Sequence, residues 1–222
     1  MNRVFGVLGA SGGVGSSTFA AVLAHCAGAA LLLDLDGSGG GIDVLLGIED
    51  VPGARWSSVQ VAGGRLDPDL LRAGVPRWGR CGVLAADMPD LAEAGIGQVV
   101  EAARSLGPVV LDLPRAPCGQ RAAGLRLCDV VVLIVRGDVV GVAAAHAVAA
   151  AMGPSAAAAM GPSAAGVAVR RGTVPADAAA EAIGLPLLAR LPPASARLSA
   201  SAMPRDLRVL AEGVVDGCWR AA

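Results

Sequence analysis

The sequence lacks lysine and tyrosine altogether, and aromatic residues make up only 2% of its 222 positions. All 18 basic residues are therefore arginines. This composition alone excludes any mechanism that depends on a catalytic lysine or tyrosine. Charged residues amount to 17%, below the roughly 25% that is usual, while hydrophobic residues reach 54%. A chain with so much apolar and so little charged sequence is expected to fold around a core rather than stay disordered.

The charge distribution gives no reason to expect a nucleic-acid partner. The formal net charge is −1, and Arg170 and Arg171 form the only adjacent basic pair, which we expect to lie on solvated surface. The five cysteines include no CxxC pair, so neither a zinc site nor a disulfide framework is indicated. Glycine, serine or proline interrupts the long uncharged stretches at 4–33 and 139–169, so neither is expected to span a membrane. We expect a cytoplasmic protein with at most an indirect membrane contact.

Short apolar runs alternate with alanine-rich stretches along the chain. The predicted strands are 4–8, 30–35, 81–85, 109–113, 130–135, 167–170 and 187–191. The predicted helices are 18–27, 91–106, 120–127, 139–151 and 175–183. Such alternation is typical of an α/β fold in which a mostly parallel sheet is flanked by helices on both faces. Ligands of such folds bind at the carboxyl ends of the strands.

Two further segments complete a single domain, which we expect to span residues 1–222. Apolar residues in 204–219 recur at spacings of three and four, which predicts a C-terminal helix that packs on the sheet. At 151–166 the octapeptide AMGPSAAA is followed by AMGPSAAG. We expect this duplication to lengthen the loop between the helix at 139–151 and the strand that follows.

The segment GASGGVGSST, residues 9–18, directly follows the first predicted strand. A glycine-rich turn that leads into a helix points several backbone N–H groups at one spot, and the helix dipole adds to the positive field. Gly12, Gly13 and Gly15 allow backbone conformations closed to other residues and let the main chain approach an anion closely. The segment therefore predicts a phosphate-binding loop, with a merely tight strand–helix turn as the alternative.

Two kinds of nucleotide-binding fold fit this loop. The letters GASGGVGS resemble the nucleotide loop of zinc-type alcohol dehydrogenases and quinone reductases, in which Asp34 or Asp36 would bind ribose. An NAD(P)-binding oxidoreductase or cofactor-binding module is therefore one hypothesis. The composition weighs against it. A short-chain dehydrogenase needs the absent tyrosine and lysine, and 222 residues leave little room for the catalytic domain of a medium-chain enzyme.

More of the chain resembles the MinD/ParA family of P-loop ATPases. ASGGVGSST is similar to that family's deviant Walker A loop, Asp34-Leu35-Asp36 to its D-x-D motif, and VVLDLP at 109–114 to its Walker B strand. Arg136-Gly-Asp138 occupies the region in which the family contacts the nucleotide base and ribose. The resemblance runs from residue 4 to about residue 151, and it implies a P-loop NTPase fold that binds ATP and Mg²⁺.

The resemblance implies a role for each matching position. Ser17, Asp34 and Asp112 would hold Mg²⁺, and Asp36 would be the catalytic residue that positions the attacking water. The residues expected to bind the nucleotide are Ser11, Gly12, Gly13, Val14, Gly15, Ser16, Ser17, Thr18, Arg136 and Asp138.

Both lysines of the family's loop are replaced, by Ser11 and Ser16. Ser11 stands where the signature lysine would reach across a dimer, and Ser16 stands where the second lysine would grip the β- and γ-phosphates. Each lost lysine is expected to weaken binding about ten- to hundredfold and turnover more, because phosphoryl transfer depends on charge neutralisation. We therefore expect a protein that binds ATP weakly or not at all and is at most a weak ATPase.

Loops without lysine are typical of the CpaE/TadZ branch, and residues 37–56 are most similar to actinobacterial CpaE-like, septum-site-determining (Ssd) proteins. That resemblance implies a homodimeric localisation or regulatory factor for septum placement or for Flp/Tad-type pilus and secretion assembly. Many relatives carry a receiver-like domain before the ATPase core, and none is expected here, because the chain starts at the first strand. An interaction scaffold that binds no ligand is a third hypothesis.

Overall fold

In the computed structural model, residues 2–28, 31–59, 66–159, 164–193, 199–201 and 203–217 are described. Eight strands of this part of the chain form one sheet in the order β3-β4-β2-β5-β1-β6-β7-β8. They are β1 (Val4–Gly9), β2 (Leu31–Asp34), β3 (Arg77–Trp78), β4 (Cys81–Leu84), β5 (Val109–Leu113), β6 (Val130–Arg136), β7 (Ala164–Arg170) and β8 (Leu187–Leu191). All neighbouring pairs are parallel except β3 and β4 at one edge.

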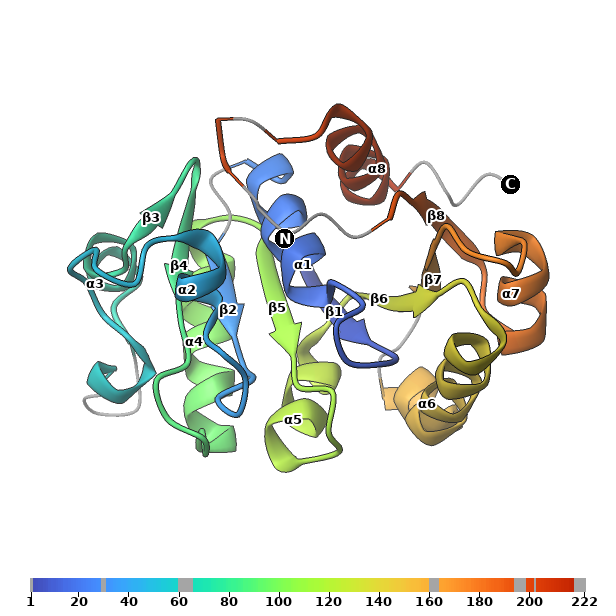
Figure 1. Cartoon of the computed structure of the whole chain (residues 1–222). Coiled ribbons are helices and arrows are strands. Elements are labelled where there is room, and N and C mark those ends of the chain that lie inside the picture. Colours follow the sequence, from blue (N-terminus) through green and yellow to red (C-terminus); the bar gives the residue numbers. More distant parts are fainter. Residues whose placement is uncertain are drawn as a thin grey trace.

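Helices cover both faces of this sheet (Figure 1). One face carries α1 (Ser16–Cys26), α2 (Ile42–Leu46) and α8 (Arg205–Asp216). The other face carries α3 (Pro68–Gly74), α4 (Glu93–Leu106), α5 (Gly119–Leu127), α6 (Val139–Ala159) and α7 (Ala176–Ile183). A short 3₁₀ turn, η1 (Trp56–Ser58), follows α2 in the chain. The predicted α/β fold with a mostly parallel sheet is confirmed.

The core consists of one apolar cluster on each face of the sheet, because the central strands are buried on both sides. Along β1, Val4 and Leu8 pack into the cluster under α4, whereas Phe5 and Val7 pack into the cluster under α1. Each such side chain contributes about 1.5–3 kcal/mol when it is fully buried. The alternation of two faces along one continuous apolar run is what a parallel sheet requires.

The predicted C-terminal helix is present as α8. Its buried residues Leu207, Ala211 and Val214 belong to the same cluster as α1, and Figure 1 shows the two helices side by side. The last residues of the predicted range, 218 and 219, lie outside the described residues. In the part of the chain that the structure describes, no helix is both long and apolar enough to cross a membrane.

The expectation that the duplicated octapeptide lengthens a loop was wrong. The helix at 139–151 instead continues as α6 to Ala159, through the whole first copy and the first residue of the second, and β7 begins at Ala164. The physical reason is composition, since alanine has the highest helix propensity of all residues and dominates this stretch. Residues 160–163, between these two elements, are outside the described part.

Candidate functional site

Strand register brings two acidic residues of distant sequence together. Asp34 ends β2 and Asp112 lies near the end of β5, and the two residues are direct partners in the parallel ladder between these strands. Both are almost completely buried, with 2% and 3% of their surface exposed. Two carboxyl groups are therefore placed beside each other at the carboxyl-terminal edge of the sheet, where ligands of such folds bind.

The glycine-rich loop between β1 and α1 lies at the same edge. Gly13 and Gly15 have φ angles of 68° and 82°, in the left-handed region that favours glycine. α1 starts at Ser16 with no side-chain cap and no acidic residue in its first turn. In the described part of the chain, no acceptor is found for the backbone N–H groups of residues 15–18. Free N–H groups at a helix start form an anion-binding site.

The hydroxyls of the two serines that replace lysine have different surroundings. A Cβ atom added to Gly9 would lie 3.0 Å from the Ser16 hydroxyl, which places that hydroxyl against the end of β1. The Ser11 Oγ is buried and has no hydrogen-bond partner in the described part of the chain. By contrast, the Ser17 hydroxyl lies close enough to Asp112 to lower the pKa of that carboxyl. Ser17 therefore joins the loop to the acidic pair.

The buried surroundings of Asp34 and Asp112 disfavour a negative charge on both carboxyl groups at once. Burial is the main cause that raises the pKa of Asp34, to about 6, although three backbone N–H groups that donate to its carboxylate act in the opposite direction. Burial and then the neighbouring Asp34 charge raise the pKa of Asp112 well above its ordinary value. A bound cation beside both carboxylates would remove this penalty.

Asp36 lies two residues after Asp34 in the chain. Its backbone N–H donates to the Asp34 carboxylate at 2.9 Å, and its own carboxylate accepts from the Ser38 hydroxyl at 2.7 Å.

Most of the predicted site residues line one cavity, of about 500 Å³. They are Gly13, Gly15, Ser16, Ser17, Thr18, Asp34, Asp36 and Asp112. Ser11, Gly12 and Val14 do not line this cavity, and Val14 is buried beneath the loop.

These residues fit a magnesium ion that is bound together with a phosphate. Mg²⁺ is usually held by only one or two carboxylates plus waters and substrate phosphates. Asp34, Asp112 and the Ser17 hydroxyl provide such a partial set, next to a loop that favours anions. In the described residues, no group of three or more histidine, cysteine or acidic side chains could hold a metal by itself. When bound, the ion would neutralise phosphate charge.

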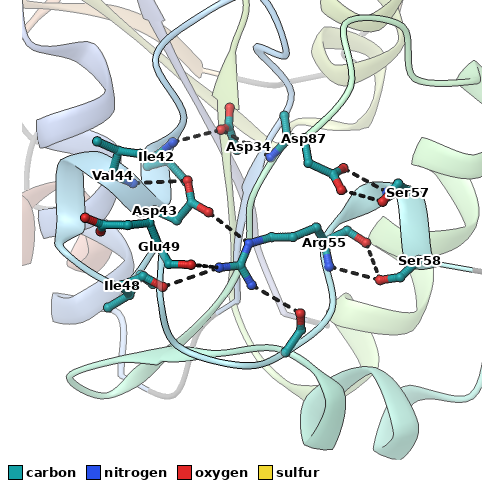
Figure 2. Close-up of polar contacts among 12 residues, drawn as sticks. Asp34, Ile42, Asp43, Val44, Ile48, Glu49, Arg55, Ser57, Ser58 and Asp87 are labelled. Carbon is teal, nitrogen blue, oxygen red and sulfur yellow. Dashed lines mark hydrogen bonds and ion pairs between the residues drawn. The ribbon is translucent and has the colours of Figure 1, made fainter.

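A loop beyond α2 supports Asp34 from the other side. The Trp56 indole N–H donates to the Asp34 carbonyl at 2.7 Å. Figure 2 shows how Arg55, the preceding residue, holds this loop: its Nε pairs with Asp43 at 2.9 Å, and its Nη2 donates to the carbonyls of both Ile48 and Glu49. No pattern in the sequence predicts a role for Arg55, because these contacts depend on how the loop folds back on α2.

Arg136 and Asp138 lie outside the cavity that contains the loop. Arg136 is the last residue of β6, Asp138 lies two residues later, and the two side chains form an ion pair at 2.5 Å. Asp138 also accepts from the Gly141 N–H at 2.7 Å, which fixes the start of α6. The structure therefore does not place these two residues in the wall of the cavity that contains the glycine-rich loop.

Arg170 is placed differently from the expectation of solvated surface. It is only 6% exposed, whereas its neighbour Arg171 is exposed. Its Nε donates to the carbonyl of Val14 and its Nη2 to that of Gly15, at 3.4 Å. The expectation was wrong for Arg170 because its place at the end of β7 directs the side chain beneath the loop. No local sequence signal marks this contact.

A larger cavity, of about 750 Å³, lies between the ends of β7 and β8 and the starts of α7 and α8. Arginines 170, 171, 190 and 205 line part of it, and much of the remaining wall is apolar. It contains neither the loop N–H groups nor the acidic pair. The candidate phosphate site is therefore the smaller cavity, where the donors and the carboxylates converge.

The strand order distinguishes between the two nucleotide-binding folds that fit the loop. In a dinucleotide-binding fold, the first strand pairs directly with the second. Here β5 lies between β1 and β2. The topology therefore does not favour the NAD(P)-binding oxidoreductase hypothesis.

No known family model matches the chain. Two uncharacterized proteins from two strains of Mycobacterium tuberculosis are each 42% identical to it over 149 residues. This match covers 66% of the chain and 43% of each relative, so the shared region is less than half of the relatives' length.

Solved structures are similar over nearly the whole chain. A ParA family ATPase from Chlorobium tepidum has a TM-score of 0.74 and 18% identity, over 97% of this chain and 91% of its own. The septum site-determining protein MinD from Pyrococcus horikoshii, complexed with Mg-ADP, has a TM-score of 0.66 and 16% identity over 100% of both chains. The MinC:MinD cell division complex from Aquifex aeolicus gives 0.62 and 15%, over 97% and 89%. The chain therefore has the fold of the MinD/ParA P-loop ATPases.

Proposed function

We propose that this protein binds Mg·ATP weakly at the glycine-rich loop, hydrolyses it slowly, and acts as a localisation or regulatory factor. The observation that carries the proposal is the convergence of the free N–H groups of residues 15–18 with Ser17 and the buried Asp34–Asp112 pair in one cavity. Donors for phosphate and carboxylates for Mg²⁺ are present together, on a fold whose solved examples include an Mg-ADP complex.

In this proposal, each of the site residues has its own role. The loop from Ser11 to Thr18 encloses the phosphates with its main chain, and Ser17, Asp34 and Asp112 hold the metal. Asp36, at the cavity wall, positions the attacking water. The base and ribose would lie toward Arg136 and Asp138. These assignments follow the resemblance of the loop and the two acidic motifs, and the cavity that joins them supports the part nearest the phosphates.

Slow turnover follows from the two serines. Neither Ser11 nor Ser16 carries a charge, and a hydrogen bond to a charged group contributes about 1.5–3 kcal/mol. Phosphoryl transfer relies on positioning and on neutralising charge in the transition state. The loss of two cations therefore reduces catalysis more than it reduces binding, because the main-chain donors still contact the ground state.

The biological role that we propose is positional. A homodimer, biased by nucleotide, would recruit or place septum components or the components of Flp/Tad-type pilus and secretion machinery, in the cytoplasm and with no nucleic acid. The resemblance of residues 37–56 to the CpaE/TadZ branch and to Ssd proteins supports this proposal. The same fold in a MinC:MinD cell division complex is consistent with work through a protein partner.

A steady-state ATPase assay tests the catalytic part of this proposal. Wild-type protein should turn over far more slowly than about 1 s⁻¹, the low end of typical enzyme rates. The variant Ser16→Lys should bind Mg·ATP roughly ten- to hundredfold more tightly, since it restores a cation at the phosphates. Ser16→Ala is the matched control and should bind as wild type does. Lysine-free turnover at about 1 s⁻¹ would contradict the proposal.

A further inference from the structure

Arg170 connects the end of β7 to the phosphate loop, although 155 residues separate it from Gly15. Its side chain lies on the α1 face of the sheet, as does that of Ala168 two residues earlier. Three different nitrogens of the guanidinium each donate to a carbonyl. Nε donates to Val14, Nη2 to Gly15 at 3.4 Å, and Nη1 to Pro192 at 2.8 Å.

These contacts fix the direction of the loop's N–H groups. In a trans peptide unit the C=O and the following N–H point in opposite directions, and no cis peptide bond occurs among the described residues. Because the carbonyls of Val14 and Gly15 point toward Arg170, the N–H groups of Gly15 and Ser16 point away from it. Successive N–H groups aimed at one side of the chain form a nest for an anion.

The guanidinium charge has no carboxylate partner in the described part of the chain. Burial lowers the pKa of Arg170, and no acidic group acts against that effect. Arg136, its register partner on β6, is by contrast paired with Asp138. Buried charges in proteins are normally paired. An anion bound at the loop in front of Arg170 would supply such a partner.

We propose that Arg170 is a positioning residue of the phosphate loop and that it supplies, from behind the loop, the positive charge that Ser11 and Ser16 do not provide. It holds two carbonyls on the far side so that the N–H groups of Gly15 and Ser16 face the phosphates. The inference rests on the proposed function in so far as the anion is the phosphate group of a nucleotide. Glycine at position 15 is compatible with this contact, since a Cβ there would overlap the guanidinium and the φ of 82° favours glycine.

The test is calorimetric titration of Arg170→Met with two probes, Mg·ATP and inorganic pyrophosphate with Mg²⁺. Both affinities should fall by roughly tenfold or more, because a charge and its hydrogen bonds are lost. Arg171→Met is the matched control. It removes the same charge from the neighbouring residue, which is exposed and donates nothing to the loop, and it should change neither affinity.

A second comparison separates positioning from a purely structural role. Adding Ser16→Lys to Arg170→Met should restore pyrophosphate binding, because a new cation replaces the lost one, whereas a structural defect would persist. Arg170→Lys keeps the charge but cannot donate to all three carbonyls, so its pyrophosphate affinity should lie between those of wild type and Arg170→Met. It also serves as the test variant if Arg170→Met does not fold.

The possible outcomes distinguish failure of the proposed function from failure of the role proposed for Arg170. Unchanged pyrophosphate and ATP affinity in a folded Arg170→Met variant would overturn the role of Arg170. If wild-type protein binds pyrophosphate but not ATP, the proposed function fails, while the Arg170 variants still test the inference with pyrophosphate. If neither probe binds to wild type or to Ser16→Lys, the loop is no anion site and the inference fails with it.

Discussion

Among single residues, the most informative positions are the two serines of the phosphate loop. The Ser16 hydroxyl lies against the end of β1, and the Ser11 Oγ is buried without a partner in the described chain. In our proposal the loop therefore contacts phosphate through its main chain. Arginine is the only basic residue type that this chain uses besides histidine, with 18 copies, and it could have replaced lysine at these positions, yet serine stands at both. In our proposal the cation comes instead from Arg170, so the loop itself needs none.

His25 gives a prediction about pH. It lies on α1 with its ring edge-on to Trp78 at 5.7 Å. Burial, and then the charges of Arg80 and Arg208, lower its pKa from the ordinary value of 6.5. The unfolded chain therefore binds a proton near pH 6.5 that the folded protein does not, so stability is lost as pH falls below about 6.5.

Thermal unfolding of wild type and His25→Gln between pH 7.5 and 5.5 measures this effect. The drop in melting temperature on acidification should be smaller for the variant, because it has no imidazole to protonate. Above pH 7 the imidazole is neutral in both states, so the difference between the two proteins should not change with pH there. An equal or larger drop for His25→Gln would show that His25 does not contribute to acid sensitivity.

The residues of the site differ in how far the sequence could predict them. Ser17, Asp34, Asp36 and Asp112 lie in short motifs directly after strands, and the structure brings all four to one cavity. Arg170 gave no such signal. Its contact with the loop depends on the order of β1, β6 and β7 in the sheet and on the face to which the end of β7 turns. Periodicity within one segment does not determine either property.

Among the helices and strands, most segments with a clear apolar pattern were predicted, including strands of four or five residues. The end of α6 was placed too early, at residue 151 instead of 159. α3 and β3 were missed, because β3 has two residues and α3 has seven. A start signal for α3 is nevertheless present, since Asp67 caps the helix and Pro68 takes its first position. For β3, pairing with β4 provides the stability that its own sequence lacks.

The loop between α2 and η1 gives a prediction about stability. Arg55 and Asp43 expose only 14% and 16% of their side chains, and Arg55 also donates to three carbonyls in the loop. Arg55→Ala should lower the free energy of unfolding by roughly 2–3 kcal/mol, because the partly buried Asp43 carboxylate and Ile48 carbonyl lose a charged donor. Urea denaturation monitored by circular dichroism measures this change.

Arg72→Ala is the control for this measurement. Arg72 pairs with Asp69 at 2.8 Å, nearly the same distance, but the two side chains are 60% and 77% exposed. Exposed ion pairs contribute about 0–1 kcal/mol, so the control should remain close to wild type. Equal losses for the two variants would indicate that burial of the Arg55 pair has no particular effect on stability.

For the whole molecule, the fold class followed from the sequence, whereas the strand order did not. Alternating strands and helices predicted a mostly parallel sheet, but only the structure shows β5 inserted between β1 and β2. That insertion makes Asp34 and Asp112 neighbours and separates this fold from the dinucleotide-binding alternative. Arrangement of this kind depends on contacts between residues far apart in sequence, which patterns within single segments do not encode.

The central claim is that the loop and the acidic pair form a site for the phosphates of Mg·ATP. Calorimetric titration of the wild-type chain tests it most directly, with Asp112→Asn as the variant that removes a metal ligand. Asp177→Asn, which changes a side chain 75% exposed and outside the site, is the control. We expect weak, saturable binding of Mg·ATP that EDTA and Asp112→Asn abolish, that Asp177→Asn leaves unchanged, and that NAD⁺ does not reproduce. Saturable binding of NAD⁺, or no heat with Mg·ATP at millimolar concentration, would contradict the claim.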